Sequence, residues 1–185
     1  MKNIAILASG SGSNAEKIVS HFQGSTKARI SLIASNKKGA YVLERAKKLG
    51  VPSHVFSKAA LESGELTAHL KNLEIDFVVL AGFLLQIPDN LIEAFPEKMV
   101  NIHPALLPNY GGKGMYGDHV HRAVKASGDK ETGITIHLVN ENYDEGKIIF
   151  QTAVGIDEND SPEQIAEKVH VLEHKYYPKI IESLI

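Results

Sequence analysis

"NIAILASGSGSNAEKIVSHF" (residues 3–22) is the stretch that decides the fold class of this chain. Residues 3–9 are a nearly continuous apolar run, which predicts a strand buried on both faces. A glycine-rich turn follows, and Ile18, Val19 and Phe22 then recur at helical spacing. A buried strand, a glycine turn and an amphipathic helix in succession indicate a parallel sheet with helices packed against it.

The rest of the chain repeats this alternation and then changes character. Further strands are predicted at 28–35, 51–56, 76–83 and 98–102, and helices at 40–50, 58–72, 88–95, 118–127 and 161–185. Residues 132–140 and 146–156 are predicted to pair as an antiparallel hairpin, and the alternation in 132–140 predicts that one face of that strand is exposed. We therefore expect a single α/β domain over residues 1–185, doubly wound around a mostly parallel sheet, with a C-terminal antiparallel hairpin and a closing helix.

The composition is that of an ordinary globular protein. Of the 185 residues, 43% are hydrophobic and 23% charged, and the formal net charge is −2, so no basic surface is expected for nucleic acid. The absence of cysteine excludes disulfides, a thiolate nucleophile and zinc–sulfur sites. No apolar stretch approaches the length that spans a membrane. We expect a soluble cytoplasmic protein that binds neither nucleic acid nor membrane.

The turn "SGSGSN" (residues 9–14) follows the first strand, at the sheet edge where open parallel sheets bind ligands. Glycine lets the backbone approach a ligand closely, and free amides at a helix start suit a phosphate group. Gly12, Ser13 and Asn14 are therefore candidate phosphate ligands, although a plain tight turn would use the same residues. No lysine completes a P-loop motif, and no acidic residue ends the second strand, which disfavours a dinucleotide.

A second polar group stands at the end of the fifth strand, in "NIHPALLPNYGGKGMYG" (residues 101–117). Asn101 and His103 are two residues apart, so in a strand their side chains share a face, and Pro104 favours extended backbone at His103. An amide N–H and an imidazole N–H that converge can stabilise a developing oxyanion. Asp144, in the hairpin loop, is a candidate to raise the His103 pKa through its negative charge. The ordinary alternatives are satisfied polar residues at a strand end and a turn aspartate.

Five segments together resemble one enzyme family. They are "ILASGSGSN" (6–14), "VVLAGF" (78–83), "NIHPALLPNY" (101–110), "TGITIHLV" (132–139) and "YDEGKIIFQ" (143–151). The resemblance runs nearly end to end and is to the 10-formyltetrahydrofolate-dependent formyltransferases, in particular the glycinamide ribonucleotide formyltransferases. The Asn-x-His-Pro-x-Leu-Leu-Pro element is shared among formyltetrahydrofolate enzymes and therefore indicates formyl transfer chemistry. The N-terminal turn resembles that of the purine enzymes in particular.

The resemblance implies a Rossmann-like formyltransferase fold. It also implies transfer of a formyl group from 10-formyltetrahydrofolate, as co-substrate, to the amine of 5-phosphoribosylglycinamide in purine biosynthesis. Asn101 and protonated His103 would stabilise the oxyanion, His103 would act as general acid, and Asp144 would support the charged imidazole. Phosphoribosylglycinamide would contact Gly12, Ser13, Asn14 and Glu173, and the folate would contact Leu84, Leu85, Gln86, Ile87, Asn101, Asn140, Glu141, Asn142, Tyr143 and Asp144.

The expected partners are small-molecule substrates alone, with no metal, in a monomer or homodimer. His119 and His121 lie two apart on a predicted helix, so they face different sides and make a poor metal pair. For Glu173 the ordinary alternative is a solvated helix face. Two other functions stay open. One is a formyltransferase for another amine, such as an amino-sugar nucleotide. The other is a non-catalytic nucleotide-binding module, in which Asn101 and His103 would lie far from Asp144.

Overall fold

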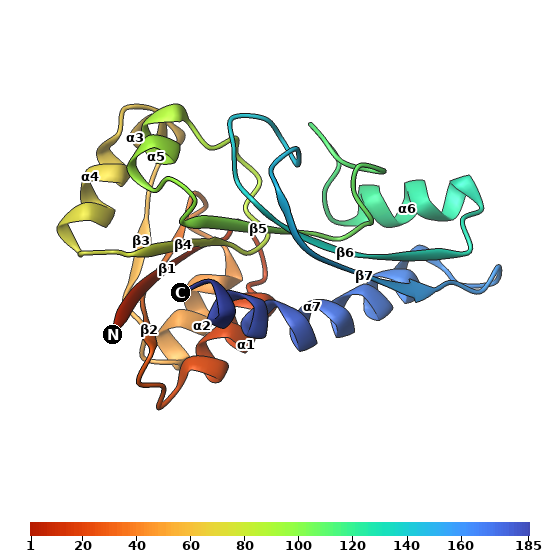
Figure 1. Ribbon diagram of the computed structural model, residues 1–185, viewed down its shortest axis with the longest axis horizontal. Coiled ribbons are helices and arrows are strands. Elements are labelled where there is room, and N and C mark those ends of the chain that lie inside the picture. Colours follow the sequence, from red (N-terminus) through yellow and green to blue (C-terminus); the bar gives the residue numbers. More distant parts are fainter.

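Seven strands form one sheet in the structure, a computed structural model that describes residues 1–185 (Figure 1). The strand order is β3-β2-β1-β4-β5-β6-β7. Strands β1 to β5 pair in parallel, β6 pairs antiparallel with β5, and β7 pairs antiparallel with β6. The strands are β1 (Lys2–Leu7), β2 (Ala28–Ser35), β3 (Ser53–Val55), β4 (Phe77–Leu80), β5 (Met99–His103), β6 (Glu131–Leu138) and β7 (Ile148–Gly155). The helices are α1 (Ser13–Phe22), α2 (Tyr41–Lys48), α3 (Lys58–Glu62), α4 (Glu65–Asn72), α5 (Asp89–Ala94), α6 (Asp118–Ser127) and α7 (Pro162–Leu184). The expected mostly parallel sheet with an antiparallel hairpin is confirmed.

Helices cover both faces of the sheet (Figure 1). Ile4 and Ile6 of β1 belong to the core cluster formed with α1, α2 and α7, whereas Ala5 and Leu7 belong to the cluster formed with α3, α4 and α5. Neighbouring residues of one strand thus enter different cores, which is why the apolar run of β1 is continuous. α6 lies at the opposite end of the molecule from α3, α4 and α5, and it contacts α7 (Figure 1).

Three predicted segments are shorter or broken in the structure. The fourth strand, predicted at 76–83, is Phe77–Leu80. The third strand, predicted at 51–56, is only Ser53–Val55, because it is an edge strand that pairs with the last residues of β2 alone. The helix predicted at 58–72 is two helices, α3 and α4. Gly64 separates them with a φ of +85°, a left-handed conformation that a continuous α-helix cannot contain.

The strand β6 is buried on both faces, so the prediction of an exposed face was wrong. Ile134 and Ile136 lie in the core cluster that contains α7. On the other face, the hydroxyl of Thr135 donates to the carbonyl of Ala105 at 2.7 Å. The polar face of β6 is therefore covered by the segment that follows β5, and its alternation reflects a polar interior surface instead of contact with water.

The closing helix α7 is capped at its start and fixed to the sheet further along. Ser161 and Gln164 form a reciprocal capping box, as the sequence predicts. Tyr177 is fully buried, and its hydroxyl lies 2.8 Å from the carbonyl of Leu80 and 3.2 Å from that of Val100, to which it donates. These contacts hold α7 against β4 and β5. None of the helices combines the length and the apolar character that crossing a membrane requires.

Candidate active site

A cavity of about 610 Å³ opens beyond the carboxyl ends of β1, β4 and β5, the edge where open parallel sheets bind ligands. Its volume suits a small-molecule site. The residues predicted for the site all line it: Gly12, Ser13, Asn14, Leu84, Leu85, Gln86, Ile87, Asn101, His103, Asn140, Glu141, Asn142, Tyr143, Asp144 and Glu173. The structure thus brings the three predicted groups together around one space, and the role of each residue stays a prediction.

The glycine turn enters the cavity with a backbone that only glycine fits at position 12. Gly12 has a φ of +77°, and a Cβ built there would lie 2.3 Å from Cγ2 of Val42. The turn is held from behind by Arg45, whose Nε donates to the carbonyl of Ser11 at 2.9 Å. α1 begins directly afterwards, at Ser13, so its first backbone N–H groups have no partner within the helix. Such an arrangement favours an anion at this end of the cavity.

Asn14 and Glu173 join the glycine turn to α7. The Asn14 Nδ2 donates to Oε2 of Glu173 at 2.8 Å, and the Asn14 Oδ1 is buried without a hydrogen-bond partner. Glu173 is 5% exposed, so the solvated helix face considered for it is wrong. Burial raises the Glu173 pKa, and the Asn14 hydrogen bond and nearby His170 offset this only in part. The pair therefore places a carboxyl group that is shielded from water beside the glycine turn.

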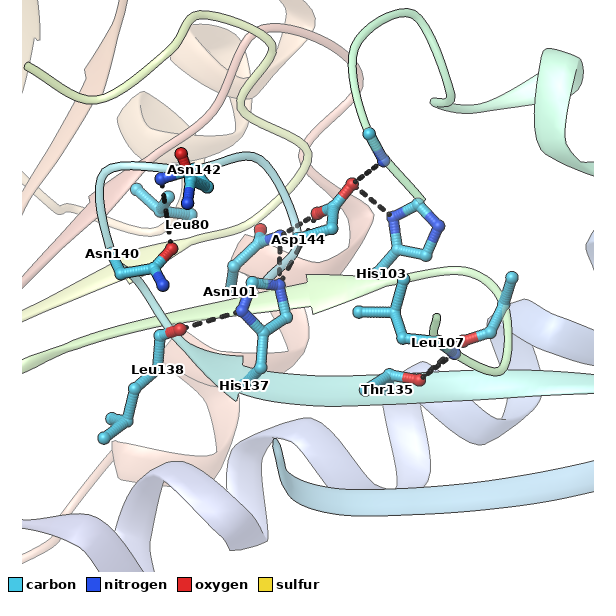
Figure 2. Close-up of polar contacts among 12 residues, drawn as sticks. Leu80, Asn101, His103, Leu107, Thr135, His137, Leu138, Asn140, Asn142 and Asp144 are labelled. Atoms are coloured by element: carbon cyan, nitrogen blue, oxygen red, sulfur yellow. Dashed lines mark hydrogen bonds and ion pairs between the residues drawn. The ribbon is translucent and has the colours of Figure 1, made fainter. Parts of the chain in front are cut away.

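The pairing of β5 with β6 assembles the polar group at the centre of the cavity. In this antiparallel ladder Asn101 lies opposite His137, and His103 lies opposite Thr135. The four side chains share one face of the sheet, while Ile102 between them packs in the core on the other face (Figure 2). The two-residue spacing of Asn101 and His103 therefore places both side chains on the same face of β5, as the sequence predicts.

The Asp144 carboxylate lies among four polar groups of this face (Figure 2). Its Oδ2 accepts the N–H of Gly112 at 3.0 Å and lies 3.4 Å from Nδ1 of His103. Its Oδ1 lies 3.5 Å from Nδ2 of Asn101 and 3.5 Å from Nε2 of His137. Burial raises the Asp144 pKa, but the His137 and His103 rings and the N–H of Gly112 outweigh it and hold the pKa below its ordinary value. The carboxylate is therefore ionised at neutral pH and places a negative charge beside His103.

His103 has one nitrogen engaged by the backbone and one free to titrate. Its Nε2 lies 2.7 Å from the carbonyl of Tyr110, which can only accept, so Nε2 carries a hydrogen. Nδ1, which faces Asp144, is then the nitrogen that gains and loses a proton. Burial lowers the His103 pKa, and it outweighs the rise caused by Asp144 and the Tyr110 carbonyl. Asp144 acts in the predicted direction, but burial, which a sequence does not reveal, reverses the net effect.

His137 fixes the orientation of the Asn101 side chain. The His137 Nδ1 lies 2.8 Å from the carbonyl of Leu138, so Nδ1 carries the hydrogen and, in the neutral ring, Nε2 is an acceptor. Asn101 Nδ2 lies 3.1 Å from this Nε2 and donates to it. A flipped amide would place its oxygen against the Nε2 lone pair and 3.5 Å from the Asp144 carboxylate. The amide nitrogen, rather than the oxygen, therefore faces the centre of the site.

Two further side chains hold the segment that follows His103. The Thr135 hydroxyl accepts the N–H of Leu107 at 3.0 Å, and Gln151 Nε2 donates to the Leu107 carbonyl at 3.0 Å and to the Thr135 hydroxyl at 2.8 Å. Thr135, His137 and Gln151 were not among the predicted site residues. The sequence does indicate that Thr135 and His137 share a face of the strand, because both alternate with isoleucines in "TGITIHLV". Only the register of β6 on β5 shows that this face lies beside Asn101 and His103.

The predicted folate segments form one wall of the cavity. Gln86 Nε2 donates to the carbonyl of Glu141 at 3.0 Å, which joins the segment after β4 to the hairpin loop. Ile87 is buried at the base of this wall. Within the loop, the N–H of Asn142 donates to Oδ1 of Asn140 at 3.1 Å. No three His, Cys, Asp or Glu side chains are arranged to hold a metal ion.

Comparison with known proteins gives a consistent result. Residues 2–181 match the formyl transferase family. The chain is 44% identical over 190 residues to the chloroplastic phosphoribosylglycinamide formyltransferase of Arabidopsis thaliana, covering 99% of this chain and 65% of that protein. It is 41% identical over 192 residues to the phosphoribosylglycinamide formyltransferase of Bacillus subtilis, covering 100% and 95%. The solved structure of glycinamide ribonucleotide transformylase 1 from Geobacillus kaustophilus superposes with a TM-score of 0.90 at 39% identity, covering 100% and 98%. The chain thus spans just under two thirds of the Arabidopsis protein and nearly all of the two bacterial ones.

Proposed function

Because this chain belongs to the formyl transferase family, we propose that it transfers the formyl group of 10-formyltetrahydrofolate to the amine of 5-phosphoribosylglycinamide, a step of purine synthesis. The family expected from the sequence is confirmed. The names of the relatives support this pair of substrates over an amino-sugar nucleotide.

One observation carries the proposal. Asn101 Nδ2 and His103 Nδ1 lie 3.5 and 3.4 Å from the two oxygens of one carboxylate, that of Asp144, inside the cavity. A module that only bound a nucleotide through the glycine turn predicts these residues far apart, and that prediction is wrong. An amide donor, an imidazole and a carboxylate in one buried place are groups that can stabilise an oxyanion and move a proton, the two tasks of acyl transfer.

The proposed transfer balances with the groups present. The substrate amine attacks the formyl carbon, and negative charge develops on the formyl oxygen. Asn101 donates to that oxygen through Nδ2, and His103 donates through Nδ1 once it is protonated. His103 then gives this proton to the folate nitrogen as the carbon–nitrogen bond to it breaks. The attacking nitrogen loses one proton, which returns to the pair formed by His103 and Asp144, so no proton is gained or lost overall.

The surroundings strengthen these interactions. His103 is 3% exposed, and charge interactions are stronger where water is excluded. Burial lowers the His103 pKa and so makes the imidazolium a stronger acid, while Asp144 limits the fall by favouring the charged ring. Loss of one oxyanion donor typically lowers turnover by roughly a hundred- to a thousandfold.

The two ends of the cavity suit the two substrates. The unpartnered amides at the start of α1 favour the substrate phosphate, and Asn14 and Glu173 lie next to them. At the other end, Leu85 and Ile87 give an apolar wall, and the backbone of the loop at 140–144 offers polar groups for a heterocycle edge.

Turnover with defined amines tests the proposal. Purified protein is mixed with 10-formyltetrahydrofolate and either 5-phosphoribosylglycinamide or an amino-sugar nucleotide, and release of tetrahydrofolate is followed. We expect saturable release with the first amine and none above background with the second. The opposite selectivity would show that the acceptor is the amino-sugar nucleotide and not 5-phosphoribosylglycinamide. Release with neither amine, under conditions where the protein is folded, would refute the transferase proposal.

A cytoplasmic location and a monomeric or homodimeric state belong to the same proposal. A chain without cysteine, with ordinary composition and small charged substrates, suits a reducing compartment. Light scattering coupled to size exclusion measures the mass in solution, and an assembly larger than a dimer would contradict the second part.

A further inference from the structure

His121 is a buried histidine whose ring nitrogens make no hydrogen bond to the protein. It lies in the first turns of α6, and its side chain is 3% exposed. The Nδ1 is covered and has no partner. Nearly all buried polar groups of folded proteins are hydrogen-bonded, because leaving one unpaired is destabilising. Nε2 also has no hydrogen-bond partner in the protein but is not covered, so it is the nitrogen that a ligand in the cavity can reach.

The location of His121 indicates what that ligand is. The ring lines the cavity together with the glycine turn, His103 and Glu173. Burial lowers the His121 pKa to about 4, and the nearby charges of His170 and His103 act in the same direction, while Asp118 opposes them. The ring is therefore neutral at physiological pH and lies close enough to His103 and to His170 of α7 for their charges to affect it.

The tautomer of this neutral ring follows from its surroundings. A buried N–H without an acceptor is rarer in proteins than a lone pair without a donor. The covered Nδ1 of His121 has no acceptor nearby, so the hydrogen is placed on Nε2. The ring thus presents one uncharged donor, which suits a hydroxyl or carbonyl oxygen. A phosphate already has the free amides at the start of α1.

We propose that Nε2–H of His121 donates a hydrogen bond to an oxygen of the sugar–glycinamide portion of the bound phosphoribosylglycinamide, and so fixes its amine relative to His103. This inference rests on the proposed function, because it names a further contact for the same acceptor substrate. It predicts that His121 affects the acceptor and leaves the folate unaffected.

A matched pair of variants separates binding from packing. His121→Phe keeps a flat ring of similar size and removes both nitrogens, whereas Val124→Ala loosens the same helix at a buried apolar residue that does not line the cavity. Calorimetry gives the affinity for phosphoribosylglycinamide, and steady-state kinetics gives the KM of each substrate. We expect His121→Phe to weaken acceptor binding by about three- to tenfold, the usual effect of one neutral hydrogen bond, with the folate KM unchanged. Val124→Ala should lower stability and leave both substrates unaffected.

Unchanged acceptor affinity in His121→Phe would overturn the proposal. So would equal weakening of both substrates, or the same loss of acceptor affinity in Val124→Ala, since either result would make His121 a packing residue. If His121→Phe does not fold, ¹⁵N-histidine spectra of the unaltered protein decide the matter. The Nε2 resonance of His121 should move on addition of phosphoribosylglycinamide and stay in place with inorganic phosphate, and an unmoved resonance would refute the contact. Failure of the unaltered protein to turn over phosphoribosylglycinamide would instead refute the proposed function.

Discussion

Replacing His137 by leucine should lower turnover by releasing the side-chain amide of Asn101. His137 itself has no place in the proposed proton transfers. Its Nδ1–H is held by the carbonyl of Leu138 at 2.8 Å, and its Nε2 accepts from Asn101 at 3.1 Å. Leucine fills much of the same space and removes the acceptor, so the Asn101 amide can rotate until its oxygen faces the site.

The size of the effect follows from what keeps the amide in place. One neutral hydrogen bond contributes about 1 kcal/mol, which is roughly a fivefold preference between the two orientations. The second contact, from Asn101 Nδ2 to Asp144 at 3.5 Å, is long and remains in the variant. The productive orientation then falls from about five sixths of the molecules to about half, so we expect kcat to fall by about twofold in His137→Leu. That is well short of the roughly hundred- to thousandfold loss expected when the Asn101 donor is removed.

A double-mutant cycle checks this reasoning. Kcat is measured for the unaltered protein, His137→Leu, Asn101→Ala and the double variant, with unfolding curves to confirm that each is folded. Because His137 is argued to act through Asn101, the double variant should have the same kcat as Asn101→Ala alone. If His137→Leu lowers kcat equally in both backgrounds, His137 acts independently of the amide, and its assignment as an orienting group is refuted.

Three further perturbations have defined outcomes. Gly12→Ala should lower the free energy of unfolding by about 2–5 kcal/mol in urea titrations, because φ is +77° and the new Cβ would lie 2.3 Å from Val42 Cγ2; a loss below about 1 kcal/mol would contradict this. Asp144→Asn removes the charge that raises the His103 pKa, so the alkaline fall of kcat/KM should move to lower pH. A move to higher pH would show that Asp144 does not favour the charged ring. Tyr177→Phe removes a buried hydroxyl that lies within hydrogen-bond distance of two backbone carbonyls. It should lower the free energy of unfolding by about 1–3 kcal/mol and leave both KM values unchanged. A selective change in one KM would place Tyr177 in substrate binding.

The parallel part of the fold could be predicted because its signals are local. Continuous apolar runs such as residues 3–9 occur where a strand is covered on both faces, and the glycine turn and helix after it fix the direction of the crossover. The errors also have local causes. The left-handed backbone of Gly64 divides the helix predicted at 58–72, and the short β3 depends on how far β2 extends beside it.

The sequence predicted the relative positions of site residues only where those residues are close together in the chain. Asn101 and His103 share a face because of their spacing, and proline next to them marks the exit of the strand. His137 and Thr135 join them through the antiparallel register of β5 and β6, which depends on tertiary packing. The alternation of polar and apolar residues in β6 was recognised, but its polar face was predicted to contact solvent. The net lowering of the His103 pKa likewise depends on burial, and burial by a remote segment has no signature in a single sequence.

Turnover of His103→Ala is the most direct test of the central claim, that formyl transfer depends on a proton and a hydrogen bond supplied at Nδ1 of this ring. Kcat is measured with saturating 5-phosphoribosylglycinamide and 10-formyltetrahydrofolate, and calorimetry confirms that both substrates still bind. The geometry predicts intact binding and a kcat reduced by at least roughly a hundredfold. A kcat within about threefold of the unaltered protein would contradict it.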